Sequence, residues 1–360
     1  MTLIEFVPPT PHPLWKLCRQ MGIDDVVVKV NPSLTGLPDP WRLETLKEIV
    51  DRLAAAGLRV VALEGDPFDM SPIKEFGATG ETPVVPVREG RAPARPEALD
   101  HYCELLESMG ALGIRLLCYN FMVGTGWART GVREGRGGAR ATYFSLHEEL
   151  GGSRSCATAD AQERVPPELK LTDEQVWANY EYFITRVMPV AERAGVRMGL
   201  HPDDPCLPEL GGYARIFGSV EAYDRAYALY PSPSNAVTFC QANFKLMLGR
   251  DKRDPPDDAA ALAEVARHFG KRIAFIHVRD VDGTKEDFTE LFHDQGSTDQ
   301  FALMRVYREL GLDVPVRGDH VPEMEGDRRL TEDCIPGYFT LGRLFANGYL
   351  KALLAGTANP

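Results

Sequence analysis

Four residues of metal-ligand type stand at the ends of four successive apolar runs in the second half of the sequence. The runs end at His201 in MGLH, at Cys240 in VTFC, at His277 in FIH and at Asp319 in VPVRGD. Two imidazoles, a thiolate and a carboxylate suit a divalent transition metal ion. Each residue alone has a plainer interpretation, as a satisfied polar group or a small buried thiol. Their spacing matches no compact motif, so the predicted metal site depends on the four positions being equivalent in the fold.

Charged residues close to these four positions fit an acidic substrate. Arg279 follows His277 by two residues, and a guanidinium can pair with a substrate carboxylate. Arg317 could pair with the substrate carboxylate in the same way, or it could form a salt bridge within the protein. Of Asp203 and Asp204, one is expected to orient an imidazole or contact a substrate hydroxyl, and the other to cap the next turn.

Two further residues are candidates for proton transfer. His320 is adjacent to Asp319 and cannot easily point the same way, so a general acid or base role suits it better than ligation. Tyr338 opens the last expected helix after a Pro-Gly turn, and a packed aromatic ring is its alternative interpretation. The remaining histidines that lie in or near expected helices or in a long connection are expected to be structural or exposed: His12, His101, His147 and His268.

The elements that must position these residues alternate along the chain. Eight short apolar runs predict strands at 3–7, 25–30, 59–64, 114–119, 197–201, 236–240, 273–277 and 314–317. Helical patterns follow them at 12–21, 41–57, 96–112, 173–195, 218–230, 257–270, 299–311 and 337–355. Several of these helices end on a glycine, where a left-handed cap is expected: Gly22, Gly57, Gly113, Gly195, Gly270 and Gly311. Eight strand-helix units predict an α/β fold, the (β/α)8 TIM barrel.

The chain is longer than such a barrel requires. A typical barrel has about 250 residues, and this chain has 360. The surplus falls in three segments after strands, 67–95, 123–171 and 278–298, and βα connections lie on the catalytic face of a barrel. We therefore expect one domain, residues 1–360, with these insertions as a cover. Arg129–Arg140 is rich in Gly and Arg, and is expected to be either a solvated surface loop or a lid that admits an anionic substrate.

Composition excludes several classes of protein. The chain is 44% apolar, and 40 basic against 52 acidic residues give a net charge of -12, which disfavours nucleic acid and anionic membranes as partners. Its seven cysteines contain no C-x-x-C, so no disulfide framework is expected. No signal peptide is recognisable, and no apolar run reaches the roughly 18 residues of a membrane span. We expect a reduced, cytoplasmic protein, with a homo-oligomer as an open possibility.

Six motifs give the chain a resemblance to a known family. They are CYNFM (118–122), WART (127–130), PVAERAGVRMGLHPDDP (189–205), FIHVR (275–279), RGDH (317–320) and PGYFTLGR (336–343). Together they resemble mannonate dehydratases, manganese-dependent sugar-acid dehydratases with a xylose isomerase-like barrel. The resemblance runs from about Met21 to Gly348. It implies Mn²⁺ held by His201, Cys240, His277 and Asp319, with His320 and Tyr338 as the acid-base pair.

The chain also departs from the family pattern. Lys29, Val30 and Asn31 stand where the family usually carries a His-His pair. Gly126 replaces an Asp before the Trp, Gln241-Ala242 replaces Gly-Ser after the Cys, and Gly318 replaces a Pro. The metal set is retained while substrate-facing positions change. The resemblance therefore implies metal chemistry on a polyol-like substrate more securely than it implies mannonate itself.

These observations predict a hydro-lyase that converts mannonate or a related aldonic acid to a 2-keto-3-deoxy acid. The residues expected to position the substrate are Asn120, Trp127, Asp203, Arg279 and His293. One alternative is a metal-dependent sugar or sugar-acid isomerase or epimerase on the same scaffold. Another is a sugar-acid binding protein without activity. The ligand types alone also permit zinc.

Overall fold

The computed structural model describes residues 1–75, 96–124, 126–148, 171–249, 257–330 and 335–358. Its main sheet is parallel throughout, in the order β1-β15-β12-β11-β8-β5-β4-β3-β2. The strands are β1 (Thr2–Leu3), β2 (Glu5–Val7), β3 (Asp25–Val28), β4 (Arg59–Glu64), β5 (Leu116–Tyr119), β8 (Arg197–Leu200), β11 (Asn235–Cys240), β12 (Ile273–Val278) and β15 (Pro315–Gly318). All eight predicted strands are present, the first in two pieces.

The two pieces of the first strand bring the ends of the sheet together. Only Ile4 separates β1 from β2, yet β1 pairs with β15 and β2 pairs with β3. The sheet is therefore a nearly closed barrel, and the predicted TIM barrel is confirmed.

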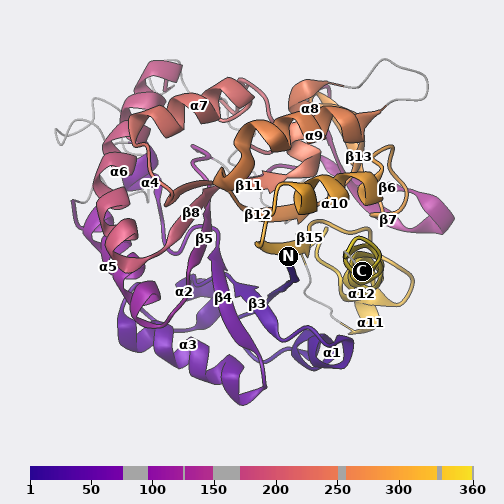
Figure 1. Ribbon diagram of the computed structural model, residues 1–360, viewed down its shortest axis with the longest axis horizontal. Helices are drawn as coiled ribbons and strands as arrows, with labels where there is room; N and C mark the ends of the chain where they lie inside the picture. The colour runs from indigo at the N-terminus through magenta and orange to yellow at the C-terminus, as the bar shows by residue number, and fades with distance from the viewer. Residues whose placement is uncertain (76–95, 125, 149–170, 250–256, 331–334, 359–360) are drawn as a thin grey trace.

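Helices surround the barrel (Figure 1). The eight that follow its strands are α1 (Pro13–Met21), α3 (Leu43–Ala55), α5 (Pro96–Ala111), α6 (Asp173–Ala194), α7 (Val220–Leu229), α9 (Asp258–Phe269), α10 (Gln300–Glu309) and α12 (Thr340–Gly356). Because they cover the outer face, the strands are apolar on both faces, and β11 and β12 are buried at every position. The six predicted capping glycines all have positive φ, although ψ of -127° places Gly270 outside the left-handed helical region.

Several short elements within the connections were not predicted. Four are helices, α2 (Pro32–Thr35), α4 (Ser71–Lys74), α8 (Gln241–Leu248) and α11 (Asp327–Leu330). Two are 3-10 turns at Arg136–Gly138 and Gly270–Arg272. Two are the paired strands β9 (Glu209–Leu210) and β10 (Tyr213–Ala214). Each is too short to give a clear hydrophobic period.

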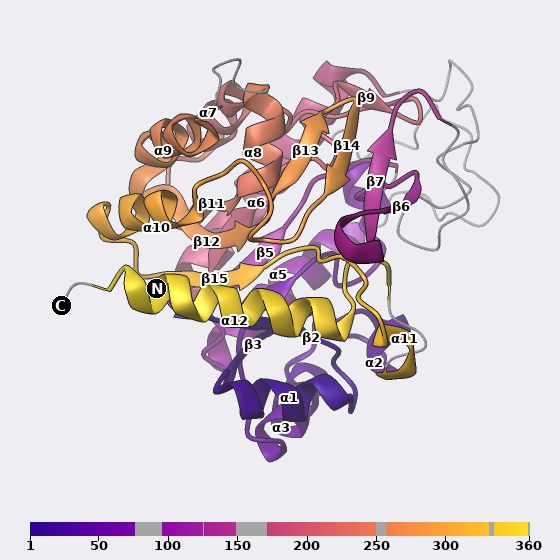
Figure 2. The ribbon, with the colours of Figure 1, turned by 90° about the vertical axis from the view of Figure 1, so that its right-hand side faces the viewer.

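A second, antiparallel sheet joins two connections on one side of the barrel (Figure 2). We call it the cover sheet; its order is β13-β14-β7-β6, with β6 (Gly131–Glu134), β7 (Arg140–Ser145), β13 (Val281–Thr284) and β14 (Asp287–Glu290). The first hairpin follows β5 and the second follows β12, and Phe144 of β7 stands opposite Phe288 of β14. The prediction of an irregular loop at Arg129–Arg140 is therefore wrong, since residues 131–134 and 140 are paired in a hairpin. The alternative of a lid stays a prediction.

Two parts of the predicted insertions lie outside the described residues. They are residues 76–95 of the first insertion and residues 149–170 of the second. Among the residues that are described, no helix is long and apolar enough to span a membrane.

Candidate active site and metal centre

The four predicted metal ligands meet at one end of the barrel. Cys240 ends β11 and His277 lies in β12, while His201 and Asp319 directly follow β8 and β15. These strands are consecutive in the sheet, so their carboxyl ends place the four side chains together. One ligand atom from each residue lies within 4.8 Å of the others, and three of the four residues are buried.

The free atoms of this group fit a bound cation. Nδ1 of His201 lies 2.8 Å from the carbonyl oxygen of Pro202, which leaves its Nε2 free. His277 is fully buried, and neither of its ring nitrogens has a hydrogen-bond partner among the described residues. Its Nδ1 lies 3.6 Å from Oδ2 of Asp319. Buried polar atoms without partners are costly, and an ion between these donors would satisfy them.

Neighbouring charges favour the ligand forms of Cys240 and Asp319. Burial opposes ionisation of the Cys240 thiol, but the nearby imidazoles of His201 and His277 and the charge of Arg279 lower its pKa to about 6. Burial also opposes ionisation of Asp319, and the charge of Arg317 holds the pKa of this carboxyl well below its usual range. With neutral imidazoles, the four ligands carry two negative charges, which suits a divalent ion.

The proposed acid-base residues lie side by side next to this group. The ring centroids of His320 and Tyr338 are 5.2 Å apart, and the Tyr338 hydroxyl donates to Oδ1 of Asp319 over 3.2 Å. His320 has a φ of 45°, in the left-handed region, so its side chain leaves the chain in a different direction from that of Asp319. The ring centroid of Trp127 lies 4.7 Å from that of His320 and 6.1 Å from that of Tyr338.

A buried ion-pair network holds His320 from the other side. Nδ1 of His320 lies 3.1 Å from both Oε1 of Glu290 and Nη2 of Arg129. Arg129 and Arg279 both pair with Glu290 and with Asp204 at 2.6–2.8 Å. Burial opposes ionisation of Glu290, but the charges of Arg279 and Arg129 lower its pKa to about 2. The network ties the cover sheet to the ends of β8 and β12.

This network also holds the side chain of Arg279. Its Nε and Nη2 bond Glu290, and its Nη1 bonds Asp204 and Asn243 at 2.8 Å and lies 3.8 Å from Sγ of Cys240. Most of its donors therefore bond protein groups, and the expectation that Arg279 binds a substrate carboxylate stays a prediction. Arg317 likewise forms the internal salt bridges that were its alternative interpretation.

Two other predicted substrate-binding residues, Asp203 and His293, have protein partners of their own. Asp203 accepts from the backbone N–H of Phe217 at 2.8 Å and faces Arg215, and burial raises the pKa of its carboxyl. Nε2 of His293 lies 2.8 Å from the carbonyl oxygen of Val278. Both side chains therefore have protein partners, and Nδ1 of His293 is buried without one among the described residues. Their contact with substrate stays a prediction.

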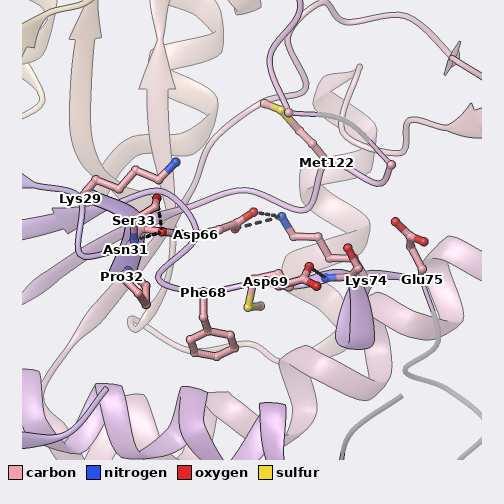
Figure 3. A pocket seen from close by; sticks show the side chains of 14 residues that line it. Lys29, Asn31, Pro32, Ser33, Asp66, Phe68, Asp69, Lys74, Glu75 and Met122 are labelled. Carbon is pink, nitrogen blue, oxygen red and sulfur yellow. Dashed lines mark hydrogen bonds and ion pairs between the residues drawn. The ribbon is translucent and has the colours of Figure 1, made fainter. Parts of the chain in front are cut away.

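Asn120 lies at a different part of the barrel mouth. Its Oδ1 accepts from Nζ of Lys74 at 2.9 Å, and Lys74 also pairs with Asp66 at 2.8 Å. Lys74 and Asp66 line a cavity of about 580 Å³ (Figure 3). Lys29 and Asn31, two of the departures from the family pattern, line the same cavity.

Three residues of the site were not predicted from the sequence. Glu64 ends β4 and contacts both Arg317 and His277, and an examination of all eight strand ends could have found it. Arg129 lies in the WART motif and begins the segment rich in Gly and Arg, but its pairing with Asp204 and Glu290 depends on the fold. Glu290 ends β14, and no local signal marks it, because β14 pairs with the distant β7.

Comparison with known proteins gives one family. The family model described as D-mannonate dehydratase (UxuA) matches residues 15–359. A mannonate dehydratase of Streptococcus agalactiae serotype Ia is 27% identical over 372 residues, which cover 94% of this chain and 98% of the relative. Another, of Streptococcus equi subsp. zooepidemicus, is 29% identical over 351 residues, which cover 92% and 88%.

Solved structures agree on the fold. The mannonate dehydratase from Streptococcus suis serotype 2 matches with a TM-score of 0.76 at 24% identity, over 99% of this chain and 93% of that one. A D-tagatose 3-epimerase-like protein matches with a TM-score of 0.57 at 12% identity, over 99% and 98%.

Proposed function

Because the chain belongs to the D-mannonate dehydratase family and is a hydro-lyase, we propose that it removes water from D-mannonate or a closely related aldonic acid. The product is the 2-keto-3-deoxy acid. The reaction depends on a divalent metal ion, Mn²⁺, held by His201, Cys240, His277 and Asp319. The observation that carries this proposal is the position of these four donors, within 4.8 Å of one another, beside His320 and Tyr338.

The chemistry requires loss of a proton from the carbon next to the carboxylate and loss of the hydroxyl from the following carbon. A bound divalent ion supplies Lewis-acid stabilisation of the charge that develops on the carboxylate side of the substrate. His320 and Tyr338 supply the two proton transfers, one from carbon and one to the departing hydroxyl, which leaves as water. The resulting enol becomes the 2-keto acid when its hydroxyl loses a proton and the neighbouring carbon takes one up to become a methylene.

The surroundings of each residue define the atom that transfers its proton. With Nδ1 of His320 held at Glu290, Nε2 is the nitrogen that remains for the substrate. The hydroxyl of Tyr338 bonds Asp319 at the edge of the metal group. Trp127 lies against both rings and keeps them in contact with each other, so the pair is fixed before substrate arrives.

The rest of the substrate chain is assigned to the cavity shown in Figure 3. Asp66 and Lys74 present a carboxylate and an ammonium there, and polyol hydroxyls can hydrogen-bond with both. Asn120 is expected to position the substrate through its bond with Lys74. We also propose that the chain forms one barrel domain and that segments 67–95, 123–171 and 278–298 cover the site. The cover sheet supports this for the two later segments.

The test joins metal analysis to a substrate panel. The protein is loaded with Mn²⁺ and incubated with D-mannonate, other aldonates and ketoses, and products are followed by mass spectrometry. We expect one bound ion per chain and loss of one water from an aldonate. Conversion of a sugar without loss of mass would instead indicate an isomerase or epimerase. Ligand-induced stabilisation without any turnover would indicate a binding protein.

A further inference from the structure

Glu64 lies beside the metal group without belonging to the four proposed ligands. It is the last residue of β4, and its Oε2 lies 3.5 Å from Nε2 of His277. Its two oxygens also accept from Arg317, Oε1 from Nη2 at 2.5 Å and Oε2 from Nε at 3.1 Å. The mechanism proposed above gives this carboxylate no function.

The two nitrogens of His277 face different partners. Nδ1 lies near Oδ2 of Asp319, on the side of the metal group, and Nε2 lies near Glu64. A neutral imidazole ligates through one nitrogen and carries its proton on the other. We propose that Glu64 is a positioning residue, which accepts the Nε2–H of His277 and so leaves Nδ1 as the metal-binding atom. This inference rests on the metal site of the proposed function.

Arg317 makes this arrangement rigid. The side chain of Arg317 is 1% exposed. Its Nη2 bonds Oε1 of Glu64, and its Nη1 lies 2.9 Å from Oδ1 of Asp319. One planar group thus orients two carboxylates, one that ligates directly and one that acts through His277. Because Oδ1 of Asp319 bonds Arg317, Oδ2 is the oxygen that faces the other three proposed metal ligands.

A second ion at Glu64 is the competing interpretation. Glu64, Cys118 and His277 also form a group whose ligand atoms lie within 4.8 Å of one another. However, Arg317 already occupies both oxygens of Glu64, and a cation placed there would meet a buried guanidinium charge. Thr238 also donates its hydroxyl hydrogen to Sγ of Cys118 at 3.3 Å. The positioning role accounts for these contacts without a second ion.

The test compares Glu64→Gln with Glu5→Gln. Glu5 is a matched control, since it is a buried glutamate of the neighbouring part of the barrel and pairs with Asn347 and Arg343. Affinity for Mn²⁺ alone is measured by competition with a chelator. We expect Glu64→Gln to bind the ion about 10- to 100-fold more weakly and Glu5→Gln to bind it like the wild type. Unchanged affinity in a folded Glu64→Gln protein overturns the inference.

A measurement on the unmodified protein is independent of any folding defect. Nitrogen-15 NMR of the Zn²⁺-loaded protein reports which nitrogen of each ligating histidine carries the proton. We expect opposite tautomers, with Nδ1–H at His201, next to the Pro202 carbonyl, and Nε2–H at His277. Two identical tautomers overturn the inference.

Stoichiometry separates the remaining outcomes. We expect one ion per chain in the wild type and in Cys118→Ala, with little change in affinity in the variant. Two ions in the wild type, one of them lost in both Cys118→Ala and Glu64→Gln, would assign Glu64 to a second site. A wild type that binds no ion refutes the proposed function, whereas normal binding by Glu64→Gln refutes only the positioning role.

Discussion

Oε1 of Glu290 lies 3.1 Å from Nδ1 of His320, and the two residues come from different layers of the molecule. His320 follows the last barrel strand, whereas Glu290 ends a strand of the cover sheet. The cover sheet therefore supplies a polar contact to the side chain that we propose transfers a proton.

Glu290→Gln is expected to reduce turnover while the ion stays bound. The amide has almost the same size as the carboxylate but cannot accept from His320, Arg129 and Arg279 with the same strength, so the imidazole loses its orientation. We expect kcat for D-mannonate to fall about 100-fold, with one Mn²⁺ still bound per chain.

The control for this variant is Glu148→Gln. Glu148 also contacts the cover sheet, where its side chain is 49% exposed and pairs with Arg133. Its substitution is expected to leave kcat unchanged. Equal kcat values for the two variants would refute a special role of Glu290.

Metal binding and turnover are expected to separate in two variants. Cys240→Ala removes a ligand and should lose the ion and activity together. His320→Asn should retain the ion and lose turnover by about 100- to 10,000-fold. Metal content by mass spectrometry and initial rates check both, with Cys103→Ala as a control for loss of a thiol elsewhere. A fully active, metal-free Cys240→Ala protein would exclude the proposed metal chemistry.

Tyr338→Phe tests the hydroxyl apart from the ring. The phenylalanine keeps the contacts with Phe6 and His320 but cannot bond Asp319 or transfer a proton. We expect thermal stability close to that of the wild type and a loss of turnover of about 100-fold or more. Turnover at the wild-type rate would assign both proton transfers to other groups.

Acid is expected to weaken the cover sheet through Glu290. In the folded protein the pKa of Glu290 is about 2, below its ordinary value of 4.5, so the ionised carboxylate stabilises the fold above pH 4.5. This contribution declines as the pH falls from 4.5 toward 2, because the proton then binds the unfolded chain more readily. Denaturant midpoints of the wild type should fall over this range, and those of Glu290→Gln should fall less. Parallel curves for the two proteins would contradict the assignment.

The sequence predicted the barrel well because its signal is local. Each barrel strand after the first is an apolar run followed by a helical period, and the four metal-ligand types stood out because they end four such runs. The cover sheet was missed because its pairing is not local. Phe144 and Phe288 stand opposite each other in the sheet, and no repeat within either hairpin indicates the other.

Side-chain roles were predicted less well for the same reason. Arg279 has the chemistry to bind a carboxylate, and only the fold reveals that Asp204 and Glu290 already occupy it. Glu64 was visible as a strand end, but its distance to His277 depends on the curvature of the barrel. The assignment of His320 and Tyr338 to proton transfer stays a prediction until turnover is measured.

The two halves of the barrel contribute differently to the site. All four proposed ligands come from residues 201–319, whereas Glu64, Trp127 and Arg129, which contact the ligand His277 or the neighbouring His320, come from the first half. During synthesis, these three groups leave the ribosome before any of the four proposed ligands. The donor set thus lies in one half of the chain, whereas its orientation depends on both halves, because Arg317 and Glu290 of the second half orient Asp319 and His320.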